Sequence, residues 1–171
     1  TWELSEDGVL TISGTGEMDD WNSSANFGWS SMRNQIKKVV INDGVTNIPS
    51  YAFYLCVNLA EISIPDGITS VGNYAFGNCT ILKEIDLPDS VVSIGRSAFA
   101  GCDNLREISI PARVTDISQY AFAGCDKLAS VGIPDGVVSI NSYAFSVCKG
   151  LTNIYYEGSE EDWIQIDIDD Q

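Results

Sequence analysis

Five cysteines are the residues of this chain whose type and spacing could carry chemistry. They are Cys56, Cys79, Cys102, Cys125 and Cys148, each 23 residues after the one before. A cysteine thiolate can attack an electrophile, bind a metal ion or form a disulfide. The chain has no histidine, which excludes Ser–His–Asp and Cys–His catalysis within it. The question is therefore whether these thiols react or only fill space.

Three interpretations compete for this cysteine column. A disulfide framework is disfavoured because five is an odd number and because one cysteine per repeat gives parallel side-chain directions. A zinc site is disfavoured because its four ligands must converge on one point. A column of buried, small hydrophobic side chains fits best, since unpaired cysteine is among the most buried residue types. We therefore expect no catalytic residue, metal or cofactor, with some disulfide bridging and thiol chemistry as the alternatives.

The same period runs through the apolar residues that must position the cysteines. One phenylalanine recurs in each unit at the same interval of 23 residues, at Phe53, Phe76, Phe99, Phe122 and Phe145. Each unit begins with an alternating stretch such as EISIP (61–65), which predicts a short strand with one buried face that ends at proline. A second extended stretch follows. The unit then closes with a segment such as GNYAFGNC (72–79), whose spacing suits one helical or 3₁₀ turn.

The units must stack, because none can bury its apolar face alone. We predict an α/β solenoid, a short right-handed coil of five 23-residue repeats over residues 36–150, with a parallel β ladder and a core of stacked phenylalanine and cysteine columns. Residues 1–35 are expected to form an N-terminal cap that resembles a β-hairpin, and residues 151–171 a C-terminal cap with an acidic tail. Four tryptophans outside the repeats are expected to plug the two ends of the core; they are Trp2, Trp21, Trp29 and Trp163.

The repeat resembles the BspA-like leucine-rich repeats of bacterial surface proteins. One unit carries the pattern in Leu82, Ile85, Leu87, Pro88, Val91, Ile94, Ala98, Phe99 and Cys102, and its equivalents cover about residues 36–156. The flanking segments 2–21 and 154–166 also resemble those that precede and close such repeats. The resemblance implies an extracellular or cell-surface bacterial protein without catalytic activity, in a family of which some members bind host proteins. No signal peptide opens the chain, whose abrupt start is typical of an excised or mature domain.

A solenoid presents the outward residues of its strand ladder as a binding face. The candidate ligand-binding residues on this face are Glu61, Ser63, Glu84, Asp86, Glu107, Ser109 and Tyr155. Their three glutamates form one acidic column, with Asp86 beside it. Like charges on neighbouring strands cost stability. The column is therefore either neutralised by the adjacent Lys83 and Arg106 or forms a contact for a cation, which would be a basic protein patch or Ca²⁺.

Charge and hydropathy narrow the classes of partner. The net charge is −15, and residues 151–171 carry 7 acidic and no basic side chains, so the chain would repel nucleic acids and anionic membranes. No apolar run is long enough for membrane insertion. Glu84 and Asp86 could pair as in glycosidases, but an exposed ladder offers no pocket that would shift their pKa.

We therefore predict a monomeric, non-catalytic adhesion or protein-binding module. It would bind a protein, such as one of the host extracellular matrix, through the outward face of the ladder. Two alternatives remain open. One is a structural spacer within a larger surface protein, and the other is a glycan-binding module in which Trp21 or Trp29 stacks on a sugar.

Overall fold

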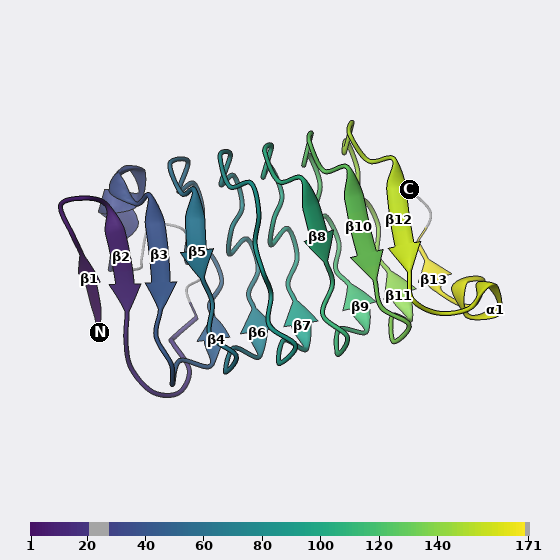
Figure 1. Cartoon of the computed structure of the whole chain (residues 1–171), viewed down its shortest axis with the longest axis horizontal. Helices are drawn as coiled ribbons and strands as arrows, with labels where there is room; N and C mark the ends of the chain where they lie inside the picture. The colour runs from purple at the N-terminus through teal and green to yellow at the C-terminus, as the bar shows by residue number, and fades with distance from the viewer. Residues whose placement is uncertain (21–27, 170–171) are drawn as a thin grey trace.

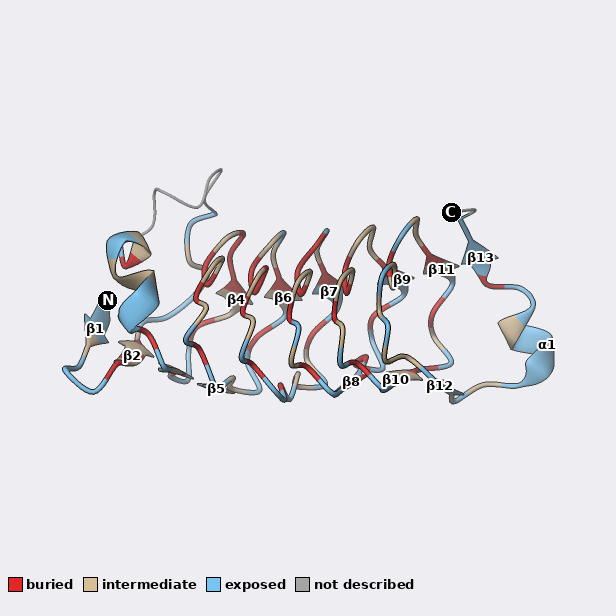
Figure 2. Ribbon diagram, turned by 90° about the horizontal axis from the view of Figure 1, so that it is seen from above, coloured by how far each residue is buried: buried red, intermediate tan, exposed pale blue. Residues whose placement is uncertain are grey.

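Each 23-residue unit forms one coil of a flattened solenoid, with two short extended stretches on opposite faces (Figure 2). The computed structural model describes residues 1–20 and 28–169. The first stretches form β3 (Lys38–Ile41), β5 (Glu61–Ser63), β8 (Glu107–Ser109), β10 (Ser130–Ile133) and β12 (Asn153–Tyr156). The second stretches form β4 (Asn47–Ile48), β6 (Ser70–Val71), β7 (Ser93–Ile94), β9 (Asp116–Ile117), β11 (Ser139–Ile140) and β13 (Asp167–Ile168). All pairings within these two ladders are parallel, as the repeat predicts.

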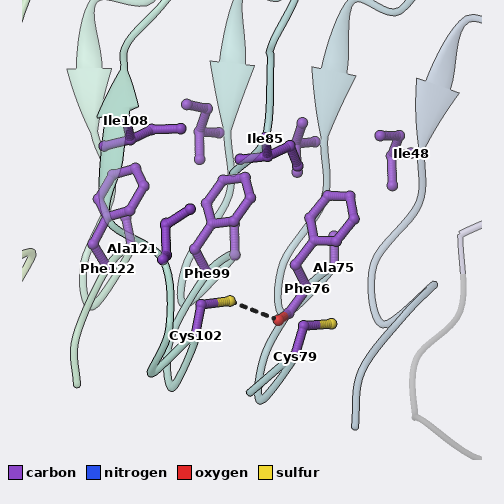
Figure 3. Packing of buried hydrophobic residues seen from close by; sticks show 14 of the residues in the cluster. Ile48, Ala75, Phe76, Cys79, Ile85, Phe99, Cys102, Ile108, Ala121 and Phe122 are labelled. Carbon is purple, nitrogen blue, oxygen red and sulfur yellow. Dashed lines mark hydrogen bonds between the residues drawn. The ribbon is translucent and has the colours of Figure 1, made fainter. Parts of the chain in front are cut away.

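The core is a stack of phenylalanine rings that runs along the solenoid axis (Figure 3). The Phe76 and Phe99 ring centroids lie 5.2 Å apart with 4° between their planes, and Phe99 and Phe122 lie 5.4 Å apart with 1° between theirs. This spacing follows from the separation of about 4.8 Å between paired strands, which places equivalent side chains of successive coils in offset stacking. A fixed residue period is therefore sufficient to align the core.

The segment around each phenylalanine differs from the helical or 3₁₀ turn that its spacing suggests. Within the described part of residues 36–150 it is a run of hydrogen-bonded turns and contains no helix. Positive φ angles occur within it, for example at Tyr74 (56°) and Asn78 (60°). They turn alternate N–H groups along the solenoid axis, so the Phe76 N–H donates to the Ala98 carbonyl at 2.7 Å. Repeated in each coil, this bond makes a third ladder, which we call the turn ladder.

The strand ladder is interrupted in the middle of the molecule. Residues 84–86 are described but form no strand, so one sheet has the order β1-β2-β3-β5 and a separate one the order β12-β10-β8 (Figure 1). The expected continuous ladder therefore lacks one rung. A physical reason is that regular pairing there would align the carboxylates of Glu61, Glu84 and Glu107 at neighbouring positions. The turn ladder continues across the gap, since the Phe99 N–H donates to the Ala121 carbonyl at 2.8 Å.

The N-terminal cap extends the strand ladder. β1 (Trp2–Leu4) pairs antiparallel with β2 (Val9–Ile12), and β2 pairs parallel with β3. A 3₁₀ helix, η1 (Ser30–Gln35), then leads into the first repeat. Before it, Trp29 is buried and stacks on Phe53, with 6.0 Å between ring centroids, and Trp2 packs edge-on against Trp29. These two side chains cover the N-terminal end of the core, as their place outside the repeats predicts.

The C-terminal cap is smaller. α1 (Glu160–Trp163) begins with a capping box in which Ser159 and Asp162 bond reciprocally. Trp163 packs against Tyr156 at 5.2 Å between ring centroids and, like Phe145 and Cys148 of the last coil, is only partly buried. Trp21 lies outside the described residues. Neither helix in the described chain is long and apolar enough to cross a membrane.

Candidate functional site

The strand-ladder face carries a hollow of about 360 Å³, which we call the ladder hollow. Five of the seven candidate residues line it, and they come from rungs that are far apart in the sequence: Glu84, Asp86, Glu107, Ser109 and Tyr155. The other two candidates, Glu61 and Ser63, line an adjoining hollow of about 200 Å³ together with Glu84 and Asp86. The fold thus brings all seven residues onto one surface centred on the unpaired rung.

Two features that the sequence analysis missed shape this hollow. Gly132 lies in register between Ser109 on one side and Tyr155 on the other, so a side chain is absent at the middle of the surface. The unpaired rung at residues 84–86 forms the other wall. The sequence contains a sign of the missing side chain, because Gly132 occupies the position that serine holds in the neighbouring unit, at Ser109. The second feature depends on pairing between units and has no local signal.

The acidic column is compensated at one end only. Lys38 bonds to Glu61 at 2.9 Å, and this hydrogen bond, together with the charge of Lys38, lowers the pKa of Glu61. Among the described residues the only other ion pair joins Lys149 to Asp126. The expected neutralising partners of the column are Lys83 and Arg106. Both line a neighbouring hollow with the glutamates. Within the described residues neither forms a direct ion pair with them.

The geometry favours contact over catalysis. Glu84 and Asp86 are both exposed, so neither lies in the kind of buried pocket in which a carboxyl group serves as a catalytic acid. Within residues 1–20 and 28–169, no three cysteine or carboxylate side chains converge closely enough to hold a metal ion. The calcium alternative therefore has no ligand cluster in the part of the chain that the structure describes. An open, acidic hollow with an aromatic wall is suited to hold a basic side chain.

The cysteine column lies in the core, away from this surface. Four of its members are fully buried and Cys148 is partly buried, and all five are free thiols. Each thiol after the first donates to the carbonyl of a phenylalanine in the coil before, as Cys102 does to Phe76 at 3.2 Å (Figure 3). Burial raises the pKa of Cys56 and Cys102 to about 12. Such thiols stay protonated at neutral pH and are poor nucleophiles.

One of the two tryptophans considered for glycan binding, Trp29, is buried and cannot contact a sugar. Trp29 is 2% exposed, between Trp2 and Phe53, and its indole N–H donates to the Ala52 carbonyl at 2.7 Å. It cannot stack on a sugar, because both its ring and its polar atom are used inside the N-terminal cap. Trp21, the other candidate for this role, lies outside the described residues.

Known proteins place these features in context. The BspA type leucine rich repeat region matches residues 30–161 in six copies. A leucine-rich repeat protein from Eubacterium ventriosum is similar to the chain at 29% identity and a TM-score of 0.82, over 94% of this chain and 42% of its own. A leucine rich cell surface protein from Faecalibacterium prausnitzii is similar at 32% identity and a TM-score of 0.74, over 99% and 41%.

A leucine-rich repeat protein from T. pallidum has 27% identity and a TM-score of 0.73, over 92% of this chain and 80% of its own. No curated protein sequence matches significantly. The chain spans less than half the length of the first two relatives. Leucine-rich repeats of this kind generally act as protein-interaction scaffolds and are typically non-catalytic. Since the family pattern covers most of its length, the chain belongs to the BspA type leucine-rich repeat family.

Proposed function

We propose that the protein is a non-catalytic adhesion module that binds another protein through the outward face of its strand ladder. The ladder hollow carries this proposal, because it joins charge, an aromatic wall and concavity at one place. A spacer that binds nothing would need only the repeated core, whereas the outward residues change from rung to rung. Lining residues that differ between coils are suited to recognise one partner.

The chemistry of the hollow favours a partner with a basic patch. Glu84, Asp86 and Glu107 supply negative charge that no direct ion pair compensates in the described chain. Tyr155 is 63% exposed and offers a ring face to a lysine or arginine side chain. A cation that contacts both an aromatic ring and carboxylates gains about 0.5–2 kcal/mol from the ring alone. We therefore expect the partner's anchor to be a lysine or arginine.

The place of action that we propose is outside the cell, where an adhesion module meets its ligand. Support comes from the Faecalibacterium prausnitzii relative, which is described as a cell surface protein. The protein is proposed to act as a monomer, since a net charge of −15 opposes self-association. Surface labelling of intact source cells with an antibody against the repeats tests the location, and sedimentation velocity tests the oligomeric state.

A binding screen tests the proposed function. The protein is applied to arrays of extracellular-matrix proteins and of glycans, and each hit is then measured with variants. We expect a protein ligand whose affinity falls at least about tenfold on Glu84→Lys, which corresponds to about 1.4 kcal/mol. Tyr155→Ala should weaken the same ligand. Circular dichroism of both variants should match the unmodified protein, because the two side chains are exposed.

The matched control is Asp66→Lys, which makes the same charge change at an exposed turn away from the ladder hollow. It should leave binding almost unchanged. Equal weakening by Asp66→Lys and Glu84→Lys would show a non-specific charge effect and contradict the site. A hit on the glycan array alone would favour the glycan-binding alternative. No hit on either array would favour the spacer.

A further inference from the structure

Both strand ladders are interrupted at the same place, in the middle of the solenoid. On the first ladder, residues 84–86 pair with neither β5 nor β8, and no arrow stands between these two strands in Figure 1. On the second ladder, β7 belongs to the sheet β4-β6-β7 and β9 to the sheet β13-β11-β9. In the described chain, the junction between the coils of residues 82–104 and 105–127 therefore lacks strand pairing on both faces.

The next junction along the chain shows which bonds are missing. There the Ile110 N–H donates to the Gly132 carbonyl at 2.9 Å, and the Val138 N–H donates to the Thr115 carbonyl at 2.8 Å. The equivalent donors one coil earlier are the N–H groups of Leu87 and Thr115. Neither has a backbone acceptor in the described chain. The junction between residues 82–104 and 105–127 is thus less completely bonded than its neighbour.

The turn ladder crosses the same junction without interruption. The N–H groups of Ser97, Phe99 and Gly101 each donate to a carbonyl of the following coil, at 3.1, 2.8 and 2.8 Å. Elsewhere at the junction isolated bonds remain, such as the one from the Ser118 hydroxyl to the Ile94 carbonyl at 2.6 Å. One intact row of bonds beside two interrupted rows is the geometry of a hinge, because rotation about the intact row breaks few bonds.

The coil of residues 82–104 departs from the repeat where its strand fails to form. Asp86 replaces the serine of the two neighbouring coils, and Leu87 replaces their isoleucine. Aspartate is depleted from strands, and leucine lacks the β-branch that favours them. Glu84 adds a carboxylate in line with those of its neighbours, and like charges on adjacent strands oppose pairing. The interruption therefore follows from residues of this coil.

The tyrosine stack beside the core is interrupted in the same coil. Two stacked pairs flank the gap, with 5.1 Å between ring centroids in each, namely Tyr51 with Tyr74 and Tyr120 with Tyr143. Ser97 holds the position between them, where the other repeats have tyrosine. The guanidinium of Arg96 lies over the Tyr120 ring, 5.5 Å from its centroid. One long side chain thus stands in place of a ring at this junction.

The ladder hollow spans the weakly bonded junction. Glu84 and Asp86 line the hollow from one side of the junction, and Glu107, Ser109 and Tyr155 line it from the other side. Rotation about the turn ladder moves these two sets of side chains relative to each other. The width of the hollow therefore depends on the angle at the junction.

We propose that the junction between residues 82–104 and 105–127 is a hinge about the turn ladder, and that its motion opens and closes the ladder hollow. The halves on either side move as rigid bodies, because at least one strand ladder is continuous within each. The hinge lets one set of lining residues fit partners of different width. This inference goes beyond the proposed function and does not depend on it, since the hinge belongs to the protein alone.

Pairs of nitroxide spin labels test the hinge. Asp43, Asp89 and Asp135 are exposed and hold the same position in their repeats, each two repeats after the one before. Labels at Asp89→Cys and Asp135→Cys span the junction, whereas labels at Asp43→Cys and Asp89→Cys do not. Both pairs are made with Cys148→Ala, because the other four native thiols are buried.

Dipolar broadening in frozen solution gives the distance distribution of each pair. We expect the distribution of the spanning pair to be at least about twice as wide as that of the control pair, because a hinge spreads distances across it only. Equal widths overturn the proposal. No partner is present in this measurement, so its result is separate from that of the binding screen.

Restoring the repeat is the matched variant. Asp86→Ser, Leu87→Ile and Ser97→Tyr together give this coil the residues of its neighbours. The distribution of the spanning pair should then narrow to the width of the control pair, while circular dichroism shows a folded protein. A folded variant whose spanning pair stays as wide as before overturns the proposal, because the hinge would not arise from this coil.

Amide hydrogen exchange of the unmodified protein needs no variant. The Phe99 N–H bonds across the junction, and the Phe76 N–H makes the equivalent bond to Ala98 within one half. A hinge keeps the turn ladder intact, so the two amides should exchange at rates within about tenfold of each other. A larger excess at Phe99 would show that the halves separate completely at this junction, which overturns rotation about the turn ladder.

Discussion

The two ends of the solenoid differ in how completely they cover the core and satisfy the backbone groups of the end coils. At the N-terminal end, Trp29 stands 23 residues before Ala52 and donates its indole N–H to the Ala52 carbonyl, while its ring stacks on Phe53. It thus supplies both the ring and the N–H that a preceding coil would supply. At the C-terminal end of the described chain, Phe145 stacks on Phe122 and on no other described ring. Within the described chain its own N–H has no acceptor.

This difference shows what a stacked repeat needs at its ends. Each turn-ladder N–H donates to the following coil, so the first coil leaves carbonyls open and the last coil leaves N–H groups open. A buried polar group without a partner costs about 1–3 kcal/mol. One tryptophan satisfies a carbonyl and covers the core at once, whereas α1 covers only part of the core. Within the described residues, the last coil is therefore the less completely covered of the two.

The largest expected effect comes from removing the ring at each end. Phe53 lies between Trp29 and Phe76 and is fully buried, so Phe53→Ala should lower the free energy of unfolding by about 3–5 kcal/mol. Phe145→Ala should cost about half as much, because its ring is partly exposed and stacked on one side. Urea unfolding measures both. Equal losses would contradict the difference between the ends.

A smaller effect isolates the hydrogen bond of the N-terminal cap. Trp29→Phe keeps a ring against Phe53 but removes the indole N–H that bonds to the Ala52 carbonyl. We expect a loss of about 1–3 kcal/mol, since this carbonyl is left buried without a donor. Trp163→Phe is the control at the other end and should cost less, because its ring is only partly buried. A larger loss of unfolding free energy for Trp163→Phe than for Trp29→Phe would contradict the difference between the ends.

Alkaline pH should test the two ends through their thiols. Burial raises the pKa of Cys56 from 9.0 to about 12, so the unfolded chain loses this proton before the folded one does. The contribution of Cys56 to the free energy of unfolding is therefore complete below pH 9. It decreases as the pH rises toward about 12, by about 1.4 kcal/mol per pH unit for one buried thiol. Cys56→Ala should flatten this fall more than Cys148→Ala does, because Cys148 is only partly buried. Equal slopes for the two variants would contradict this.

The smallest effect concerns reactivity without any change in stability. Thiol labelling of the native protein should modify Cys148 first, because it is only partly buried and the other four thiols are fully buried. Labelling of the others should require unfolding by denaturant. Mass spectrometry of the labelled protein identifies the site. Rapid labelling of Cys102 in the native state would show that the cysteine column is accessible.

Much of the core could be predicted from the period alone. Phe76, Phe99 and Cys102 stack as their spacing predicts, because a constant repeat length places equivalent residues in equivalent positions of each coil. The turn ladder could not be predicted as easily. A spacing that suits a helical turn also suits a run of turns, and the two differ in backbone angles such as the φ of Tyr74, which residue types do not reveal.

The sequence predicted which residues of the candidate site face outward, but it did not predict the hollow between them. Alternation along each strand placed Glu84, Glu107 and Tyr155 on the surface, since successive side chains point to opposite faces. The hollow between them depends on Gly132 lying beside Ser109 and on the loss of pairing at residues 84–86. Both are relations between coils, which a single unit does not contain.

The sequence by itself determined the period, the buried columns and the acidic character of this protein, because each depends on residue types that recur at a fixed spacing. The tertiary structure decided where the repetition fails. The rung at residues 84–86 does not pair, Trp29 closes one end of the core, and Ile154 remains exposed at the other. These outcomes differ between chemically similar positions because burial and pairing depend on what the next coil supplies.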